Sequence, residues 1–250
     1  MNKVSIIVTA YLQESKPYLD ACIQSIHNLN YPKELIETIL VCPTWYQPKY
    51  DNVTTVTPCM GAYHNPIAVN YGMNQASKDS KYLFMMNDDV ILTRNSLARL
   101  IEAAGDADVC LSPISNCDNY GHYQLQFPGG LTERQYRIEQ IKHLIPDMLA
   151  SDSLYPTGFI FPQTLYLYAN LFPRKVWEKV GGFDENFKTG FDDTDWCMRA
   201  QRAGVRLAIA MNSLVWHCSG ASADTTMGKL DSDVRAENEK YFRTKWNISS

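Results

Sequence analysis

Several features that would assign this chain to a functional class at once are missing from its sequence. It has no run of basic residues, and its net charge is −4, from 23 Lys and Arg against 27 Asp and Glu. Strong non-specific binding to a nucleic-acid backbone is therefore not expected. No apolar stretch is as long as a membrane span, and the chain passes from Met1 directly into a strand pattern without a signal peptide. These absences predict a cytoplasmic protein with no transmembrane segment.

The cysteines also lack a pattern. There are seven, an odd number, and none belongs to a CxxC pair or to another spacing typical of metal ligands. Because several fall on apolar faces of predicted elements, buried free thiols are expected rather than a disulfide framework. A chain of 250 residues can bury a large core, so its folding requires neither disulfides nor a structural metal.

What the sequence does have is an alternation of strand and helix patterns over residues 1–112. Residues 4–10 form a nearly continuous β-branched run, which is typical of a parallel strand buried on both faces. Helical spacing follows over residues 16–29, with Ser15 as a candidate N-cap, and a second strand is predicted at residues 36–42. This order predicts a right-handed βαβ unit in a nucleotide-binding half, whose ligand would lie beyond the carboxyl ends of the strands.

The remaining elements are predicted in the same way, although less regularly after residue 112. Together they indicate one compact α/β domain with a mixed central sheet flanked by helices. Strands are expected at residues 53–56, 82–86, 90–92, 108–112, 165–172 and 205–211, and helices at 65–76, 97–101, 132–145, 173–181, 193–203 and 229–246.

Two adjacent carboxylates, Asp88 and Asp89, stand between the apolar runs at 82–86 and 90–92. Charges in such surroundings usually need a partner, and a divalent cation with its anionic ligand would supply one. The structural alternative is a solvated turn between two strands of a hairpin. This stretch alone does not separate the two interpretations.

Two further groups could carry chemistry. Asp192, Asp193 and Asp195 fall at a predicted helix start, where capping and the helix dipole account for one or two acids. Three together would repel one another, and repulsion raises a carboxyl pKa toward a value suited to accepting a proton from a hydroxyl. His217 follows a short apolar strand. Such a residue is more often structural than a ligand, but a metal site at Asp89 would need further ligands.

Taken in order, six motifs make the chain resemble the GT-A-fold glycosyltransferases of family 2, particularly their rhamnosyltransferase-like branch. The resemblance covers almost the whole chain. It implies a Rossmann-like mixed sheet, with a nucleotide-sugar-binding half at residues 1–112 and an acceptor and catalytic half at 113–250 that ends in a helix. The motifs are Val4–Tyr11, Asn87–Val90 as a variant DxD, Gly181–Phe187 as GGFDExF, Asp192–Asp195 as EDxD, His217–Ser222 as HxxGxS, and Tyr241–Trp246.

The resemblance implies an inverting, metal-dependent transferase that moves a hexose, deoxyhexose or pentose from a nucleotide sugar to an acceptor hydroxyl. Asp89 would bind Mn²⁺ or Mg²⁺, with His217 as a candidate further ligand. Asp193 would be the general base, supported by Asp192. The donor-binding residues implied by the motifs are Thr9, Ala10, Tyr11, Glu14, Asn70, Asn87 and Asp88.

The chain departs from the family pattern in the donor site. Val41–Thr44 replaces the acidic segment after the second strand, so the carboxylate that usually reads the nucleobase is missing. Val69 replaces the Arg of the family's ARNxG segment, and Asp192 replaces the Glu of EDxD. The sugar and the base of the donor are therefore not predicted.

Alternatives remain open for both activity and acceptor. A sugar-phosphate nucleotidyltransferase would share the acidic ligands, but it would need a Gly-rich, basic phosphate loop that residues 10–14 lack. The second alternative, suggested by the two lost donor residues, is a non-catalytic nucleotide- or carbohydrate-binding protein of the same fold. The family's usual acceptors are surface glycans and lipid-linked sugars; a hydroxylated base of modified viral DNA is an alternative that the net charge does not support.

Overall fold

The computed structural model describes residues 1–11, 13–58, 65–115, 157–188, 190–218 and 232–248. The helix predicted at residues 132–145 lies outside this set, as do Cys59, Cys117 and most of the HxxGxS motif. Cys22, Cys42, Cys110 and Cys197 are buried free thiols, as predicted. None of the described helices is both long and apolar enough to cross a membrane.

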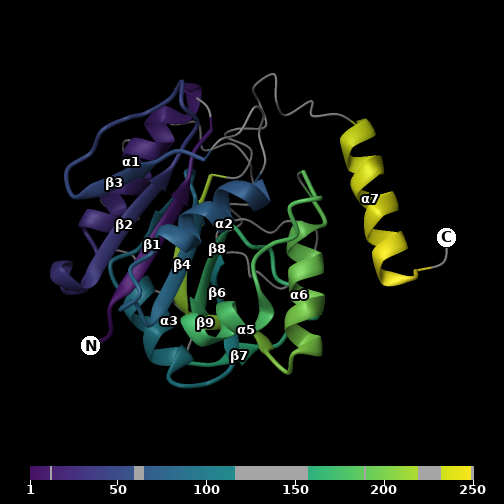
Figure 1. The fold of residues 1–250 in the computed structure, drawn as a ribbon. Coiled ribbons are helices and arrows are strands. Elements are labelled where there is room, and N and C mark those ends of the chain that lie inside the picture. The colour runs from purple at the N-terminus through teal and green to yellow at the C-terminus, as the bar shows by residue number, and fades with distance from the viewer. Residues whose placement is uncertain (12, 59–64, 116–156, 189, 219–231, 249–250) are drawn as a thin grey trace.

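A single mixed sheet runs through the molecule, with helices on both of its faces (Figure 1). Its strand order is β3-β2-β1-β4-β8-β6-β9-β5, and β7 pairs with β9. The first four strands are parallel, β8 is antiparallel to β4, and β6 and β9 are parallel to each other. The strands are β1 (Val4–Thr9), β2 (Ile36–Val41), β3 (Val53–Val56), β4 (Tyr82–Asn87), β5 (Val90–Leu92), β6 (Val109–Ser115), β7 (Phe159–Ile160), β8 (Ala169–Pro173) and β9 (Arg206–His217).

Alternate residues of β1 enter two separate cores because successive side chains of a strand point to opposite faces. Val4, Ile6 and Val8 pack in the core beneath α1 and α3, whereas Ile7 packs in the core beneath α2, α5 and α6. The helices are α1 (Lys16–His27), α2 (Asn65–Gln75), α3 (Ser96–Ala104), α5 (Arg174–Val180), α6 (Asp192–Arg202) and α7 (Ser232–Trp246), with 3-10 turns η1 (Gln13–Ser15) and η2 (Lys33–Leu35).

Helix α2 lies very close to the sheet at Gly72. A Cβ atom on this residue would come within 2.6 Å of Ile7 Cγ2 and 2.7 Å of Val41 Cγ2. Both neighbours are buried side chains of the central strands. A residue larger than glycine would therefore push α2 away from β1 and β2.

Two predicted strands differ from the observed ones. The strand predicted at residues 205–211 continues to His217, because it resumes pairing with β6 at Leu214 after an irregularity and then pairs with β5. The strand predicted at residues 165–172 is only Ala169–Pro173. Pro173, predicted to start a helix, instead pairs with Tyr82 in extended conformation, and the helix starts one residue later.

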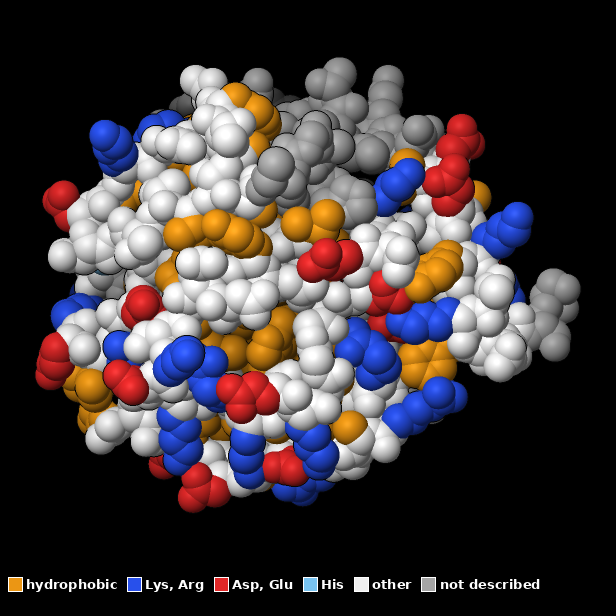
Figure 2. Space-filling view, viewed as in Figure 1, with side chains coloured by type: hydrophobic (Ala, Val, Ile, Leu, Met, Phe, Trp, Pro, Cys, Tyr) orange, Lys and Arg blue, Asp and Glu red, His pale blue; other side chains and the backbone are white. Residues whose placement is uncertain are grey.

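Charged side chains of both signs alternate along the lower edge of the face shown in Figure 2. Three ion pairs occur at the amino ends of β4 and β6. They join Lys81 to Asp106 at 2.6 Å, and Lys175 and Lys179 to Asp108 at 2.7 and 3.1 Å. This edge is opposite the carboxyl ends of the parallel strands, where a ligand was predicted.

Helix α7 packs along α6 at the outside of the molecule (Figure 1). Tyr241 and Phe242 pack against Phe187, with ring centroids 4.9 and 6.4 Å apart. The indole Nε1 of Trp246 donates a hydrogen bond of 2.9 Å to Asp195 Oδ1 on α6. The C-terminal helix is thus fixed to the helix whose first turn contains the predicted general base, Asp193.

Candidate active site

The carboxyl ends of the central strands meet at one edge of the sheet. Thr9 pairs with Asn87 of β4 on one side and with Val41 of β2 on the other. Ala10 N donates to Val41 O at 2.9 Å, and Tyr11 is buried beside it. Four predicted donor residues, Thr9, Ala10, Tyr11 and Asn87, therefore lie together at this edge.

The turn formed by Asp88 and Asp89 does not close a hairpin. β4 pairs with β1 and β8, whereas β5 pairs with β9 at the end of the strand order. Each of the two aspartates is only 5% exposed. The alternative of a solvated hairpin turn is wrong, because the chain crosses from the middle of the sheet to its edge at this point.

Asp89 lies directly beside His217. Val90 pairs with His217, and Cys218 N donates to Asp89 O at 2.9 Å, so the sheet itself brings the two side chains together. His217 Nε2 is 3.3 Å from Asp89 Oδ1. That carboxylate oxygen is buried and makes no hydrogen bond to any described residue. Tyr168 stacks on the imidazole with ring centroids 4.2 Å apart, which fixes the plane of the ring.

Asp88 has a different partner, and the sequence reasoning missed it. Ser15 Oγ donates a hydrogen bond of 2.6 Å to Asp88 Oδ2. Ser15 was predicted to cap α1, but its side chain makes no capping bond because its hydroxyl is directed to this carboxylate. Burial and the neighbouring charge of Asp89 raise the pKa of Asp88 to about 7 despite the bond from Ser15. A cation beside the two carboxylates would relieve this repulsion.

These residues fit a divalent cation. Carboxylate and imidazole are both suitable ligands for such ions. Adjacent ligands of an octahedral ion with bonds of about 2.1 Å lie about 3 Å apart, and Asp89 Oδ1 and His217 Nε2 are separated by 3.3 Å. Among the described residues no group of three or more His, Cys, Asp or Glu could enclose a metal. The described residues would thus contribute few ligands, and phosphate oxygens and water would be suitable for other positions, as is usual for Mg²⁺ at substrate phosphates.

Asp192 and Asp193 begin α6 after a strained turn. Gly190 has a φ of 89° and Phe191 a φ of 66°, a left-handed conformation that non-glycine residues rarely adopt. Gly190 N donates to Asp192 Oδ1 at 3.0 Å, and Thr194 N donates to Asp193 Oδ1 at 2.7 Å. Burial and the adjacent Asp192 raise the pKa of Asp193 to about 7. This carboxyl group is therefore matched to proton transfer near neutral pH.

The third acid of this cluster has a structural role. Asp195 is fully buried and accepts hydrogen bonds of 2.9 Å from Arg199 Nε and Trp246 Nε1. Lys245 Nζ lies 2.6 Å from Asp195 Oδ1, the oxygen that also accepts the hydrogen bond from Trp246 Nε1. Only two of the three predicted acids thus remain for chemistry, since Asp195 joins α6 to α7.

Asn70, predicted to bind the donor, holds the loop at residues 181–187. Its Nδ2 donates to Phe183 O and to Glu185 Oε1 at 2.9 Å each, and its Oδ1 accepts from Phe183 N at 2.8 Å. A Cβ on Gly182 would come within 2.5 Å of Asn70 Oδ1, which explains the glycine. The donor-binding role of Asn70 stays a prediction, as does that of Glu14, of which only the backbone in η1 is described.

Asn65 is a further residue that the sequence reasoning missed. It begins α2, and its Nδ2 lies 3.5 Å from Asp192 Oδ2. This contact joins the amino ends of α2 and α6. Nothing in the local pattern around residue 65 indicates it, because the partner is 127 residues away.

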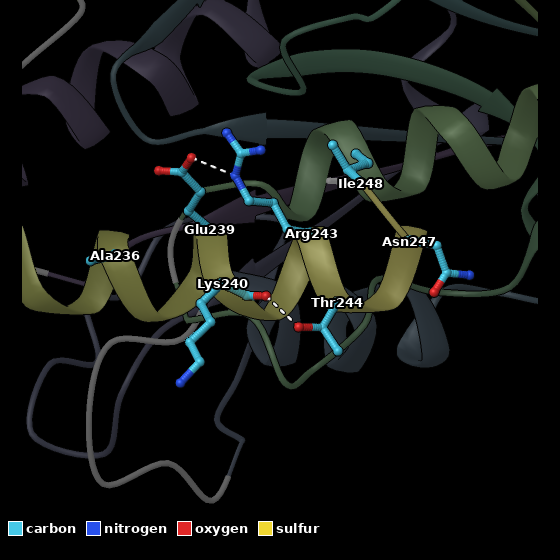
Figure 3. A pocket seen from close by; sticks show the side chains of 7 residues that line it. All are labelled: Ala236, Glu239, Lys240, Arg243, Thr244, Asn247 and Ile248. Carbon is cyan, nitrogen blue, oxygen red and sulfur yellow. Dashed lines mark hydrogen bonds and ion pairs between the residues drawn. The ribbon is translucent and has the colours of Figure 1, made fainter. Parts of the chain in front are cut away.

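An open hollow of about 710 Å³ lies on α7, outside both acidic clusters (Figure 3). It is formed by one helix and the residues that follow it, and an ion pair of 2.9 Å between Arg243 and Glu239 crosses its surface. None of the predicted site residues lines it. Its lining residues are Ala236, Glu239, Lys240, Arg243, Thr244, Asn247 and Ile248.

Several solved glycosyltransferase structures share this fold at low sequence identity. A mannosyltransferase from Pyrobaculum calidifontis, in complex with GDP-Man and Mn²⁺, is 15% identical with a TM-score of 0.58, over 86% of this chain and 56% of that chain. GalNAc-T7 with UDP, GalNAc and Mn²⁺ is 14% identical with a TM-score of 0.63, over 87% and 44%. Residues 1–349 of S. aureus TarS, in complex with UDP-GlcNAc, are 15% identical with a TM-score of 0.58, over 98% and 72%.

These similarities define the class: the chain has the GT-A fold of nucleotide-sugar glycosyltransferases, as predicted. It spans about half the length of the first two structures. Residues 2–232 match the family described as "Glycosyltransferase like family 2", and the chain therefore belongs to this family. The nucleotidyltransferase alternative is thereby set aside. No curated protein matches the sequence significantly.

Proposed function

We propose that the protein is a metal-dependent, inverting glycosyltransferase that transfers a sugar from a nucleotide-sugar donor to an acceptor hydroxyl. The observation that carries the proposal is the buried Asp89 Oδ1, which makes no hydrogen bond to a described residue and lies 3.3 Å from His217 Nε2. Two of the structures with the same fold contain Mn²⁺ together with a nucleotide or nucleotide sugar, which supports the same arrangement here.

The donor end of the site is formed by the edge that holds Asp88, Asp89 and His217. Mn²⁺ or Mg²⁺ bound by Asp89 and His217 would act as a Lewis acid that stabilises the departing nucleoside diphosphate. Asp88, oriented by the hydroxyl of Ser15, keeps this edge negative and is placed to support the cation or the donor ribose.

The acceptor end is formed by the first turn of α6. Asp193 accepts the proton of the acceptor hydroxyl, and its pKa of about 7 leaves much of it deprotonated at neutral pH. Asp192, which Gly190 N and Asn65 hold in place, supports it. As the acceptor oxygen bonds to the anomeric carbon, the bond from that carbon to the diphosphate breaks on the opposite face. One displacement inverts the carbon and needs no protein nucleophile.

We assign the donor to the half formed by residues 1–112 and the acceptor to the half formed by 113–250. The turn between β4 and β5 of the first half supplies Asp88 and Asp89, and α6 of the second half supplies Asp193. His217, at the end of β9, links the halves, since it belongs to the second half but lies beside Asp89.

The experiment is a thermal-shift titration with UDP and GDP, with Mn²⁺ or with EDTA. We expect Mn²⁺-dependent stabilisation of the wild type by at least one of them, and its loss in Asp89→Asn. Asp79→Asn, which changes an exposed acid away from the site, is the matched control. Equal stabilisation in EDTA, or in Asp89→Asn, would contradict a metal site. Donor hydrolysis by the wild type but not by Asp193→Asn separates an enzyme from a non-catalytic binder.

A further inference from the structure

The turn that follows β2 carries an exposed aromatic side chain near the donor edge. β2 ends at Val41, which pairs with Thr9, and Thr9 in turn pairs with Asn87, so the ends of β2, β1 and β4 lie side by side. Trp45 follows four residues after Val41 and is 62% exposed. A single exposed aromatic residue is common on protein surfaces and does not by itself indicate a ligand.

Trp45 is supported by its neighbour. The rings of Trp45 and Tyr46 stack with centroids 6.1 Å apart at an interplanar angle of 26°. Tyr46 is 5% exposed and belongs to the core beneath α1. Tyr46 N also donates to Pro43 O at 3.0 Å, which closes the turn. Trp45 therefore rests on a fixed base while most of its own surface faces solvent.

The hydroxyl of Tyr46 is a second, independent observation at the same place. It is buried and makes no hydrogen bond to any described residue. A buried hydroxyl without a partner lowers stability, so its presence calls for an explanation such as a ligand. Burial, and then the negative charges of Asp88 and Asp20, raise the pKa of Tyr46. The hydroxyl thus remains a donor and lies within the field of the donor-site carboxylate.

The position suits the nucleoside part of a donor. β2 and β4 flank β1, so their ends are two strand spacings apart, about 10 Å. A nucleoside whose diphosphate is held at Asp89 extends over a comparable distance. Residues 42–46 include no carboxylate that could accept hydrogen bonds from the edge of a base. An aromatic ring can instead bind the face of any base by stacking.

We propose that Trp45 and Tyr46 form a nucleoside-binding platform, in which Trp45 stacks on the base of the donor and Tyr46 donates a hydrogen bond to the nucleoside. The inference rests on the proposed function and specifies how the same site recognises its donor. Because stacking uses the face of a base and not its edge, the platform accepts both a pyrimidine and a purine.

The test is isothermal titration calorimetry with Mn²⁺ and three probes: UDP, GDP and inorganic pyrophosphate. We expect Trp45→Ala to weaken UDP and GDP binding by about tenfold or more, and to leave pyrophosphate binding unchanged. Trp45→Phe should retain most of the affinity. Phe161→Ala, which removes an aromatic side chain that is 61% exposed elsewhere, should change none of the three.

Tyr46→Phe gives the second measurement. It should weaken UDP and GDP binding while leaving thermal stability unchanged or higher, because it removes a buried hydroxyl that makes no hydrogen bond within the described part of the chain. If the hydroxyl had a purely structural role, Tyr46→Phe would lower thermal stability and leave UDP and GDP binding unaltered.

The outcomes separate this inference from the function on which it rests. Loss of all three probes in Asp89→Asn supports the metal site, whatever Trp45 does. If Trp45→Ala and Tyr46→Phe then bind UDP and GDP as tightly as the wild type, the platform is wrong and the metal site stands. If the wild type binds pyrophosphate no better than Asp89→Asn, the metal site is wrong, and a loss of UDP affinity in Trp45→Ala would still support the platform.

Discussion

Lys245 Nζ lies 2.6 Å from Asp195 Oδ1, and this contact joins α7 to the turn of α6 that carries Asp193. The same ammonium group lies 2.6 Å from Asp184 Oδ2. Burial alone would raise the pKa of Asp184, but hydrogen bonds from Lys245, the Asn186 backbone and Tyr241 outweigh it and hold the pKa well below its usual range. One cation therefore connects three segments around the proposed general base.

Lys245→Met should lower the free energy of unfolding by about 1–3 kcal/mol, because it leaves the buried Asp195 with fewer partners. Arg199 and Trp246 remain bound to Asp195, which limits the loss. Chemical denaturation measures the change. Lys240→Met, at an exposed position of the same helix, is the control and should have little effect. Equal losses in the two variants would show that the contact of Lys245 with Asp195 does not hold α7.

Asp193→Asn should lower turnover by about 100-fold or more, since it removes the proposed general base. Metal-dependent nucleotide binding should not change. In the wild type, kcat should rise with pH through about 7, where the raised pKa of Asp193 places its deprotonation. A pH profile without this rise, or full activity of the variant, would argue against Asp193 as the base.

The raised pKa of Asp193 makes stability change with pH in the opposite direction to kcat: its contribution to the free energy of unfolding falls as the pH rises. Because the folded-state pKa of Asp193, about 7, exceeds the ordinary value of 3.8, the folded state holds the proton more tightly than the unfolded chain. The contribution of Asp193 is complete below the ordinary value and is lost as the pH rises through about 7. Asp193→Asn should make the unfolding free energy less dependent on pH over this interval. Thermal unfolding of the wild type and the variant at several pH values measures this difference in pH dependence.

Ser15→Ala should weaken Mn²⁺ binding by about tenfold, because it removes the hydroxyl that orients Asp88 beside the proposed metal ligand. It should also reduce stability by about 1–3 kcal/mol, the usual effect of losing a hydrogen bond to a charged group. Ser15→Thr keeps the hydroxyl and should restore binding. If alanine and threonine behave alike, the bond to Asp88 does not matter for the cation.

Gly72→Ala should cost about 1–3 kcal/mol by overpacking, since the added methyl would meet Ile7 and Val41 at 2.6 and 2.7 Å. Gly158→Ala is the matched control, because its nearest neighbour, Met211 Sδ, would be 3.6 Å away. Thermal unfolding of both variants tests the comparison. A Gly72→Ala protein as stable as the wild type would mean that α2 can move away from the sheet at little cost.

Local patterns were sufficient to locate most of the described elements. The β-branched run of β1, the spacing in α1 and the Asn65–Pro66 start of α2 each depend on neighbouring residues, and each was predicted close to its observed bounds. The resemblance in motif order then indicated the GT-A fold. The ends of β8 and β9 were predicted less well, because strand ends depend on pairing with distant strands.

The contacts within the site were harder to predict, because their partners are far apart in the sequence. Ser15 has the local signature of a helix cap, but its acceptor on Asp88 is 73 residues away. Asp195 and Asp193 are alike in the sequence, and the partners of Asp195 on α6 and α7 distinguish it from the proposed general base. A single sequence does not indicate which of these distant residues bind one another, because that depends on how the strands and helices pack.

The pairing of β5 with β9 has a consequence for the energetics of donor binding. Val90 and His217 are held by main-chain pairing, and Tyr168 limits rotation of the imidazole. Few rotatable bonds of Asp89 and His217 therefore remain to be ordered when a ligand arrives. The conformational entropy of Asp89 and His217 is therefore lost when the protein folds and not when the ligand binds, so the donor end is preorganised. Its affinity for the ligand should depend little on how flexible the rest of the chain is.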